Sequence, residues 1–174
     1  MRVSKIKSLL EVVTNVAVLL AAVGVLSALS WGYFAQRSAP PVQNGFQRGQ
    51  PVAKLPKVDY SGAPKTLLIA MNTGCHFCTE SIPFYNGLVS SNPGTDKTTR
   101  VVAVFPNKED EVRQYVRQHQ LNLEAVAGVD FRALNVSATP TMILVDSNGK
   151  VLDFWVGKQS EDGERLIVKT INAS

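Results

Sequence analysis

The stretch Thr73-Gly74-Cys75-His76-Phe77-Cys78-Thr79-Glu80-Ser81-Ile82-Pro83 contains both cysteines of the 174-residue chain. An apolar run, Thr66 to Met71, precedes it and predicts a strand. A helical pattern follows as far as Ser90, and we expect Pro83 to kink that helix. A strand that leads into Cys-x-x-Cys at the start of a helix is typical of a dithiol redox site.

The placement of the two cysteines predicts a different role for each. The first turn of a helix has unpaired N–H groups and the positive end of the helix dipole, and both stabilise a thiolate. We therefore expect Cys75, at the exposed edge, to be the nucleophile, with a pKa below that of a free thiol. Cys78, one turn further on, is the expected resolving cysteine.

Two other interpretations of the cysteine pair remain open. A structural zinc site needs four ligands, and the only histidines are His76 and His119, the second on a helix expected to be solvated. A purely structural disulfide would close so short a loop that it gains little stability. We favour redox chemistry carried by a Cys75–Cys78 disulfide, with no metal and no organic cofactor.

Residues 1–34 predict a short cytoplasmic tail and a membrane anchor. Residues 12–34 contain no charged side chain, and a segment of this length can cross a bilayer as a helix. Basic residues precede the segment and aromatic residues end it, so the rest of the chain is expected outside the cytoplasm. The basic residues are Arg2, Lys5 and Lys7, and the aromatic residues are Trp31, Tyr33 and Phe34. A cleavable signal peptide, cut near Ala28-Leu29-Ser30, is the alternative.

Residues 35–57 are rich in Pro, Gly and Gln and predict a flexible linker, and residues 58–174 predict the folded domain. Within the linker, the part from Gly49 to Tyr60 has a second interpretation, as a strand added to the domain. The net charge of +4 is modest and no basic stripe is present, so we expect no nucleic-acid surface.

The periodicity of residues 58–174 alternates between strand and helix. We expect an α/β domain with a mixed sheet and helices on both of its faces. Asn148-Gly149 between the last two strands is a strong hairpin signal. The expected strands are 66–71, 100–105, 124–127, 141–145 and 151–156; the expected helices are 75–90, 108–120 and 160–171, with a helical turn at 130–134.

Further motifs give the chain a family resemblance. Thr139-Pro140-Thr141 lies just before an apolar strand, Pro83 follows Cys78 by five residues, and Asp146 to Lys150 forms an Asp-x-x-Gly-Lys turn. Together with the Cys-x-x-Cys, these residues make the chain resemble the thioredoxin-fold superfamily from Gly49 to its end. It is most similar to the TlpA/ResA-type branch, which comprises membrane-tethered bacterial thiol–disulfide oxidoreductases.

The resemblance implies a fold, a location and an activity. It implies a thioredoxin-like domain on the periplasmic or extracytoplasmic side of the cytoplasmic (inner) membrane, held by a single-pass anchor. The clients would be protein thiols and disulfides, with a membrane or periplasmic electron donor, and the expected direction is reduction, for example of apocytochrome c. Pro140 would be cis and would present the backbone of Thr139 to a client; a trans turn proline is the alternative. His76 and Phe77 would tune the redox poise, and Phe77 would also be an exposed contact for partners.

Three positions depart from the family pattern. Ile69 stands where thioredoxin has a buried aspartate, and Gly74 stands where a tryptophan is common. TlpA-like chains often have a glutamate three residues after the second cysteine, a position occupied here by Ser81. Glu80 is one residue too early and is only a weak candidate for the proton acceptor of Cys78, which therefore stays unassigned.

Three other functions remain as alternatives. A dedicated disulfide oxidant would differ from a reductant in its reduction potential. A thiol peroxidase needs Thr or Ser three residues before the reactive cysteine, where this chain has Asn72. A copper carrier would bind Cu(I) tightly through Cys75, Cys78 and a histidine without reducing disulfides.

Overall fold

The computed structural model describes residues 45–90 and 99–173, together with residues 20, 24 and 27. The domain is one compact unit, Asn44–Ser174. The predicted anchor at residues 12–34 lies outside the described residues apart from those three positions. Among the residues that the structure describes, no helix combines the length and apolar character that a bilayer crossing requires.

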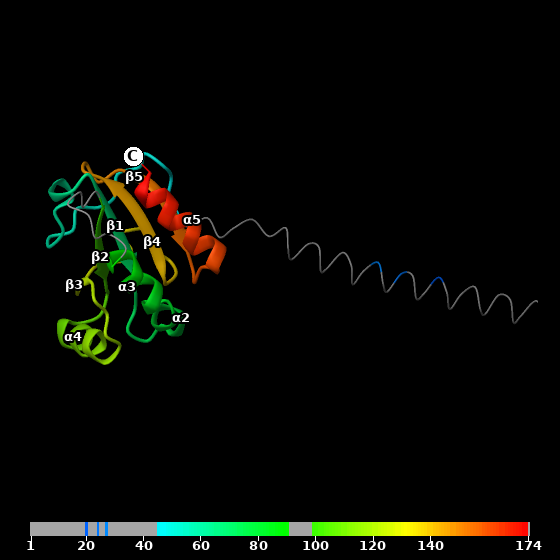
Figure 1. Ribbon diagram of the computed structural model, residues 1–174, viewed down its shortest axis with the longest axis horizontal. Coiled ribbons are helices and arrows are strands. Elements are labelled where there is room, and N and C mark those ends of the chain that lie inside the picture. Colours follow the sequence, from blue (N-terminus) through cyan, green and yellow to red (C-terminus); the bar gives the residue numbers. More distant parts are fainter. Residues whose placement is uncertain (1–19, 21–23, 25–26, 28–44, 91–98, 174) are drawn as a thin grey trace, which may run out of the picture. The chain divides into compact units, whose positions relative to one another are not determined.

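The core of the domain is a five-stranded mixed sheet with the order β3-β2-β1-β4-β5 (Figure 1). The three strands on one side of the sheet run parallel, and β4, the first strand of the terminal hairpin, is antiparallel to β1. The prediction of a mixed sheet with a terminal hairpin is therefore confirmed. The strands are β1 (Lys65–Ala70), β2 (Thr99–Val104), β3 (Glu124–Val126), β4 (Thr141–Asp146) and β5 (Val151–Val156).

The register of the central strands brings two distant segments to one edge of the sheet. Ala70, the last residue of β1, pairs with Val104 at the end of β2 and with Thr141 at the start of β4. The chain that leaves β1 leads into the cysteines, and the chain that enters β4 is Thr139-Pro140. Strand pairing alone therefore places these segments side by side.

All four α-helices of the described residues lie on one face of the sheet, so the prediction of helices on both faces is wrong. Residues of every helix share one apolar cluster with Leu67 and Ile69 of β1. The physical reason is that the β1–β2 and β2–β3 crossovers advance in the same direction, and right-handed crossovers of that kind put their helices on one face. The helices are α2 (His76–Glu80), α3 (Ile82–Ser90), α4 (Glu109–Gln118) and α5 (Glu161–Asn172).

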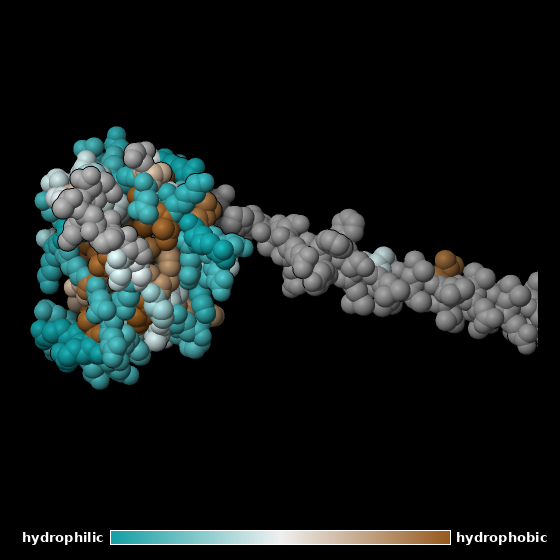
Figure 2. All heavy atoms as spheres, viewed as in Figure 1, coloured by the Kyte–Doolittle hydropathy of each residue, from teal (hydrophilic) through white to brown (hydrophobic). Residues whose placement is uncertain are grey.

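Irregular chain covers the opposite face of the sheet. Residues 46–60, which lead into the 3-10 helix η1 (Tyr60–Gly62), and residues 129–136 pack on Leu68, Val102 and Ile143. The expected helical turn at 130–134 is a run of turns. Because both faces are covered, β1 and β4 are buried almost throughout. Hydrophilic residues predominate at the periphery of the domain in the view of Figure 2.

The predicted flexible linker, residues 35–57, is wrong from residue 45 onward, because this part of the chain belongs to the domain. Phe46 is buried and its ring lies 5.6 Å from that of Phe154. The N–H of Gly49 donates to the carbonyl of Val151 at 2.7 Å, and the N–H of Val52 donates to that of Gly149 at 2.8 Å. The alternative prediction, that Gly49 to Tyr60 is a strand added to the domain, is correct in its location but not in its form, because this stretch makes only isolated bridges, such as that between Pro51 and Lys150.

The helix expected over residues 75–90 is divided in two at Ser81. Pro83 has no N–H to continue the hydrogen bonds of α2, and it is tolerated where it stands, in the first turn of α3. The N–H of Ser81 donates to the carbonyls of Phe77 and Cys78, at 3.2 and 3.3 Å, which ends α2. The break separates α3, which packs on the sheet, from the short helix α2 that begins with the Cys-x-x-Cys.

Candidate active site

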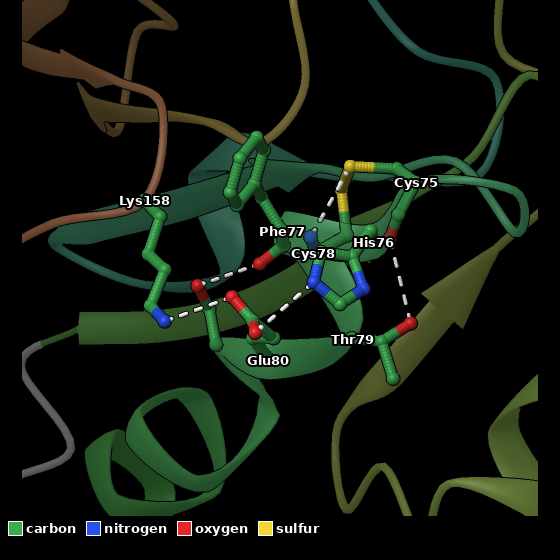
Figure 3. A network of polar contacts seen from close by, with 8 residues as sticks. Cys75, His76, Phe77, Cys78, Thr79, Glu80 and Lys158 are labelled. Atoms are coloured by element: carbon green, nitrogen blue, oxygen red, sulfur yellow. Dashed lines mark hydrogen bonds and ion pairs between the residues drawn. A yellow bond between two sulfur atoms is a disulfide. The ribbon is translucent and has the colours of Figure 1, made fainter.

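The two cysteines lie at the start of α2 and form a disulfide, with their Cα atoms 5.3 Å apart (Figure 3). Cys75 is the N-cap residue, and its Sγ accepts a hydrogen bond from the N–H of Cys78 at 3.2 Å. Cys78 is completely buried, whereas Cys75 is only partly buried. Cys75 is therefore the more accessible of the two residues.

The backbone of Thr139 lies directly against the disulfide. Its carbonyl oxygen is 3.4 Å from Sγ of Cys75, and the Thr139–Pro140 peptide bond is cis. Two hydrogen bonds hold this segment in place. Gly157 donates its N–H to the carbonyl of Pro140 at 2.7 Å, and the hydroxyl of Thr141 donates to the carbonyl of Ala138 at 2.8 Å.

Three charged or titratable side chains meet beside the cysteines. Oε1 of Glu80 lies 3.1 Å from Nε2 of His76, and Oε2 of Glu80 lies 2.9 Å from Nζ of Lys158 (Figure 3). The hydrogen bond from Lys158, followed by the smaller effects of His76 and of the Lys158 charge, holds the pKa of Glu80 below its usual value. The cluster lies at the surface, since all three side chains are partly or largely exposed.

Hydroxyl groups link the active-site helix to the rest of the domain. The hydroxyl oxygens of Thr79 and Tyr115 are 2.9 Å apart, which joins α2 to α4, and Thr79 also donates to the carbonyl of Cys75 at 3.4 Å. The hydroxyl of Ser81 donates to the carbonyl of Phe77 at 2.8 Å. Burial raises the pKa of Tyr115, so its hydroxyl is protonated at neutral pH.

The environments of Phe77 and Ile69 differ sharply. Phe77 is 55% exposed, and its ring lies 5.7 Å from that of His76. Ile69 is fully buried in the same apolar cluster as Cys78. The site thus presents an aromatic side chain to solvent and an aliphatic interior beneath the second cysteine.

Three residues of the site were missed from the sequence: Thr79, Tyr115 and Lys158. Lys158 reaches Glu80 across a separation of 78 residues, and no local pattern could have predicted that contact. Thr79 directly follows Cys78 in the sequence, yet its partner Tyr115 is known only once α4 is placed on the sheet. Across the described ranges, no group of three or more His, Cys, Asp or Glu side chains could hold a metal ion.

Comparison with known proteins identifies the architecture. No protein-family model and no curated protein sequence matches the chain. Among solved structures, a putative thiol:disulfide interchange protein DsbE from Chlorobium tepidum is similar at 25% identity and a TM-score of 0.61, over 73% of this chain and 99% of that one. This is the fold of the thioredoxin-like thiol–disulfide oxidoreductases.

Two further structures agree with the thioredoxin-like assignment. The thioredoxin domain of a thiol-disulfide oxidoreductase from Bacteroides vulgatus shares the fold at 16% identity and a TM-score of 0.59, over 73% of this chain and 99% of that one. A secreted disulfide oxidoreductase of Mycobacterium tuberculosis, homologous to E. coli DsbE, shares it at 16% identity and a TM-score of 0.51, over 64% and 82%. The predicted thioredoxin-fold resemblance is confirmed, and the Cys75–Cys78 disulfide gives the thioredoxin-like domain the redox group of a thiol–disulfide oxidoreductase.

Proposed function

We propose that this thioredoxin-like protein is a membrane-anchored, extracytoplasmic reductant of protein disulfides, with apocytochrome c as one client class. The observation that carries the proposal is the asymmetry of the disulfide. Cys75 is accessible, caps α2 and lies against the backbone of Thr139, whereas Cys78 is buried behind it. The sulfur of Cys75 is thus placed to form a mixed disulfide with a client, and the sulfur of Cys78 is placed to displace the client from Cys75.

The reaction proceeds through a mixed disulfide. The thiolate of Cys75 attacks one sulfur of a client disulfide, whose S–S bond breaks, and the departing client sulfur takes a proton. Cys78, once deprotonated, attacks the sulfur of Cys75 and releases the second client thiol. Two electrons have then passed to the client, the Cys75–Cys78 disulfide has formed, and a dithiol donor in the membrane or periplasm reduces it again.

The surroundings of Cys75 supply the proposed client contacts. An extended client segment pairs with the backbone of Thr139, which would bring its sulfur towards Cys75, 3.4 Å from that carbonyl. Phe77, 55% exposed, offers an apolar surface beside the sulfur. His76, when protonated, stabilises the Cys75 thiolate and shifts the redox poise.

The proposed extracytoplasmic location of the domain rests on residues 1–34 and on one structurally similar protein. Residues 12–34 hold the protein in the cytoplasmic membrane, and the basic residues before them stay in the cytoplasm. The structurally similar Mycobacterium tuberculosis protein is secreted, which supports an extracytoplasmic domain. The direction of reduction rests on the resemblance to the TlpA/ResA branch.

Cysteine variants and a redox titration test the proposal. The reduced chain should reduce a model protein disulfide, Cys75→Ser should abolish this activity, and Cys78→Ser should accumulate a mixed disulfide that a thiol releases. Turnover by Cys75→Ser would refute the mechanism. Equilibration with glutathione decides the direction, because a reductant stays oxidised in a buffer that leaves an oxidant such as DsbA reduced.

A further inference from the structure

Glu80 is held between two basic side chains that come from distant parts of the fold. His76 lies one turn before it on α2, and Lys158 lies in the loop between β5 and α5 (Figure 3). The Glu80 carboxylate uses one oxygen for each partner, at 3.1 and 2.9 Å. Its negative charge is therefore matched by the Lys158 ammonium whether or not His76 is protonated.

The loop that carries Lys158 is fixed to the segment beside Cys75. Gly157, the residue before Lys158, donates its N–H to the carbonyl of Pro140 at 2.7 Å. Gln159, the residue after it, donates its side-chain amide to the carbonyls of Val156 and Gly157 at 3.1 and 2.9 Å. The backbone that carries Lys158 is thus tied to the segment that contains the Thr139 carbonyl, which lies 3.4 Å from Sγ of Cys75.

We propose that Lys158 and Glu80 are positioning residues that set the reduction potential of the Cys75–Cys78 pair. Glu80 orients the imidazole of His76, and Lys158 cancels the carboxylate charge. An unpaired carboxylate on so short a helix would otherwise oppose the negative charge of a Cys75 thiolate. The inference deepens the proposed function and rests on it, since it assumes that the disulfide is reduced and reoxidised.

An electrostatic role and a merely structural role predict different results. An exposed ion pair contributes little to stability. A merely structural role therefore predicts that removal of either partner changes the equilibrium constant for reduction of the disulfide only slightly and in the same direction. An electrostatic role predicts opposite signs. Loss of Lys158 leaves a net negative charge that disfavours the thiolate, and loss of Glu80 leaves a net positive charge that favours it.

The test is the exchange equilibrium of the full-length chain with glutathione at neutral pH. The Cys75–Cys78 bond breaks, two glutathione thiols are oxidised to one glutathione disulfide, and their two protons pass to Cys78 and either to Cys75 or, where Cys75 stays a thiolate, to solvent. Glu80→Gln should raise the equilibrium constant for reduction of the protein about threefold, and Lys158→Met should lower it about threefold. Lys158→Arg keeps the positive charge and should leave the equilibrium constant at the parent value. The double variant Glu80→Gln/Lys158→Met removes one charge of each sign, so its equilibrium constant should lie close to the parent value.

Glu124→Gln is the matched control. Glu124 forms an ion pair with Arg100 at 2.6 Å on β3, two strands away from β1, and its loss should leave the equilibrium constant unchanged. The inference is overturned if Glu80→Gln and Lys158→Met shift the constant in the same direction, or if neither differs from Glu124→Gln. A parent chain that does not exchange with glutathione at all would refute the proposed function, and this inference with it. If the parent chain exchanges with glutathione and the Glu80 and Lys158 variants have the parent equilibrium constant, the inference alone is refuted and the proposed function stands.

Discussion

The Sγ atom of Cys75 lies 3.4 Å from the carbonyl oxygen of Thr139, a residue that precedes β4. The same sulfur also accepts a hydrogen bond from the N–H of Cys78 at 3.2 Å. In the reduced protein these two neighbours have opposite effects on the pKa of Cys75, because a hydrogen-bond donor stabilises the thiolate and an acceptor stabilises the thiol. We expect the donor to prevail, since the positive end of the helix acts with it.

The first prediction concerns the ionisation of Cys75. In the Cys78→Ser variant, the rate of alkylation should follow a titration with a midpoint below about 8.5, the value for a free thiol. The measurement is the rate of reaction with iodoacetamide as a function of pH. The same variant unfolded in denaturant is the control and should titrate near the free-thiol value. A folded-state midpoint at or above the control would show that the Thr139 carbonyl dominates.

The second prediction concerns the link between α2 and α4. Tyr115→Phe removes the hydroxyl that lies 2.9 Å from that of Thr79, and we expect it to lower the free energy of unfolding by about 1 kcal/mol. Urea denaturation measures the change. In the Tyr115→Phe background, Thr79→Val should cost less than it does alone, because the two residues share one hydrogen bond. Additive losses would mean that the hydroxyls do not interact.

The elements that could be predicted from the sequence are those determined by local patterns. The apolar run of β1 and the turn at Asn148-Gly149 each contain their own signal, and both were predicted within a residue or two. The redox pair was predicted for the same reason, since Cys75 and Cys78 lie one helical turn apart on a single element.

The features that were wrong or missed depend on tertiary structure. The face on which α4 lies follows from the strand order, which periodicity does not give. Residues 45–57 have the composition of a linker, yet single apolar residues such as Phe46 are enough to fix them to the sheet. Lys158 meets Glu80 only because the β5–α5 loop returns to the edge where β1 ends.

The third prediction concerns the hairpin turn. Gly149 has a φ of +75°, and a Cβ added to it would lie 2.9 Å from Cδ2 of the buried Tyr60. We expect Gly149→Ala to lower the free energy of unfolding by about 1–2 kcal/mol, from both the backbone conformation and the clash. Gly87→Ala on α3 is the matched control. Its Cβ would meet nothing within 4 Å, so it should stabilise the protein by about 0.5–1 kcal/mol. Equal effects at the two positions would contradict the assigned geometry.

The fourth prediction concerns stability in acid. Asp146 accepts the N–H groups of Lys150 and Asn148 at 2.8 and 2.9 Å, and the bond from Lys150 is the largest cause of a pKa below the usual 3.8. A lowered folded-state pKa means that the stabilisation is present above the unfolded value and is lost as pH falls through the folded value.

Asp146→Asn separates this contribution from the other acidic groups. The amide oxygen introduced by the substitution would accept the same N–H groups at every pH, so the variant should lose less Tm than the parent between about pH 5 and about pH 3. Thermal unfolding followed by circular dichroism gives both curves. Asp59 and Glu80, whose pKa values are also lowered, are common to the two proteins and cancel in the comparison. Parallel curves would show that Asp146 does not contribute to the loss of stability in acid.

The fifth prediction concerns the boundary of the domain. Phe46 is only 6% exposed and packs against Phe154, although it lies in a segment with the composition of a linker. We expect Phe46→Ala to lower the free energy of unfolding by about 3 kcal/mol, because it leaves a cavity under the chain that covers the sheet. Phe77→Ala is the matched control: this side chain is 55% exposed, and its loss should change stability by less than about 0.5 kcal/mol. If the two substitutions cost the same in urea denaturation, residues 45–57 do not form part of the folded core.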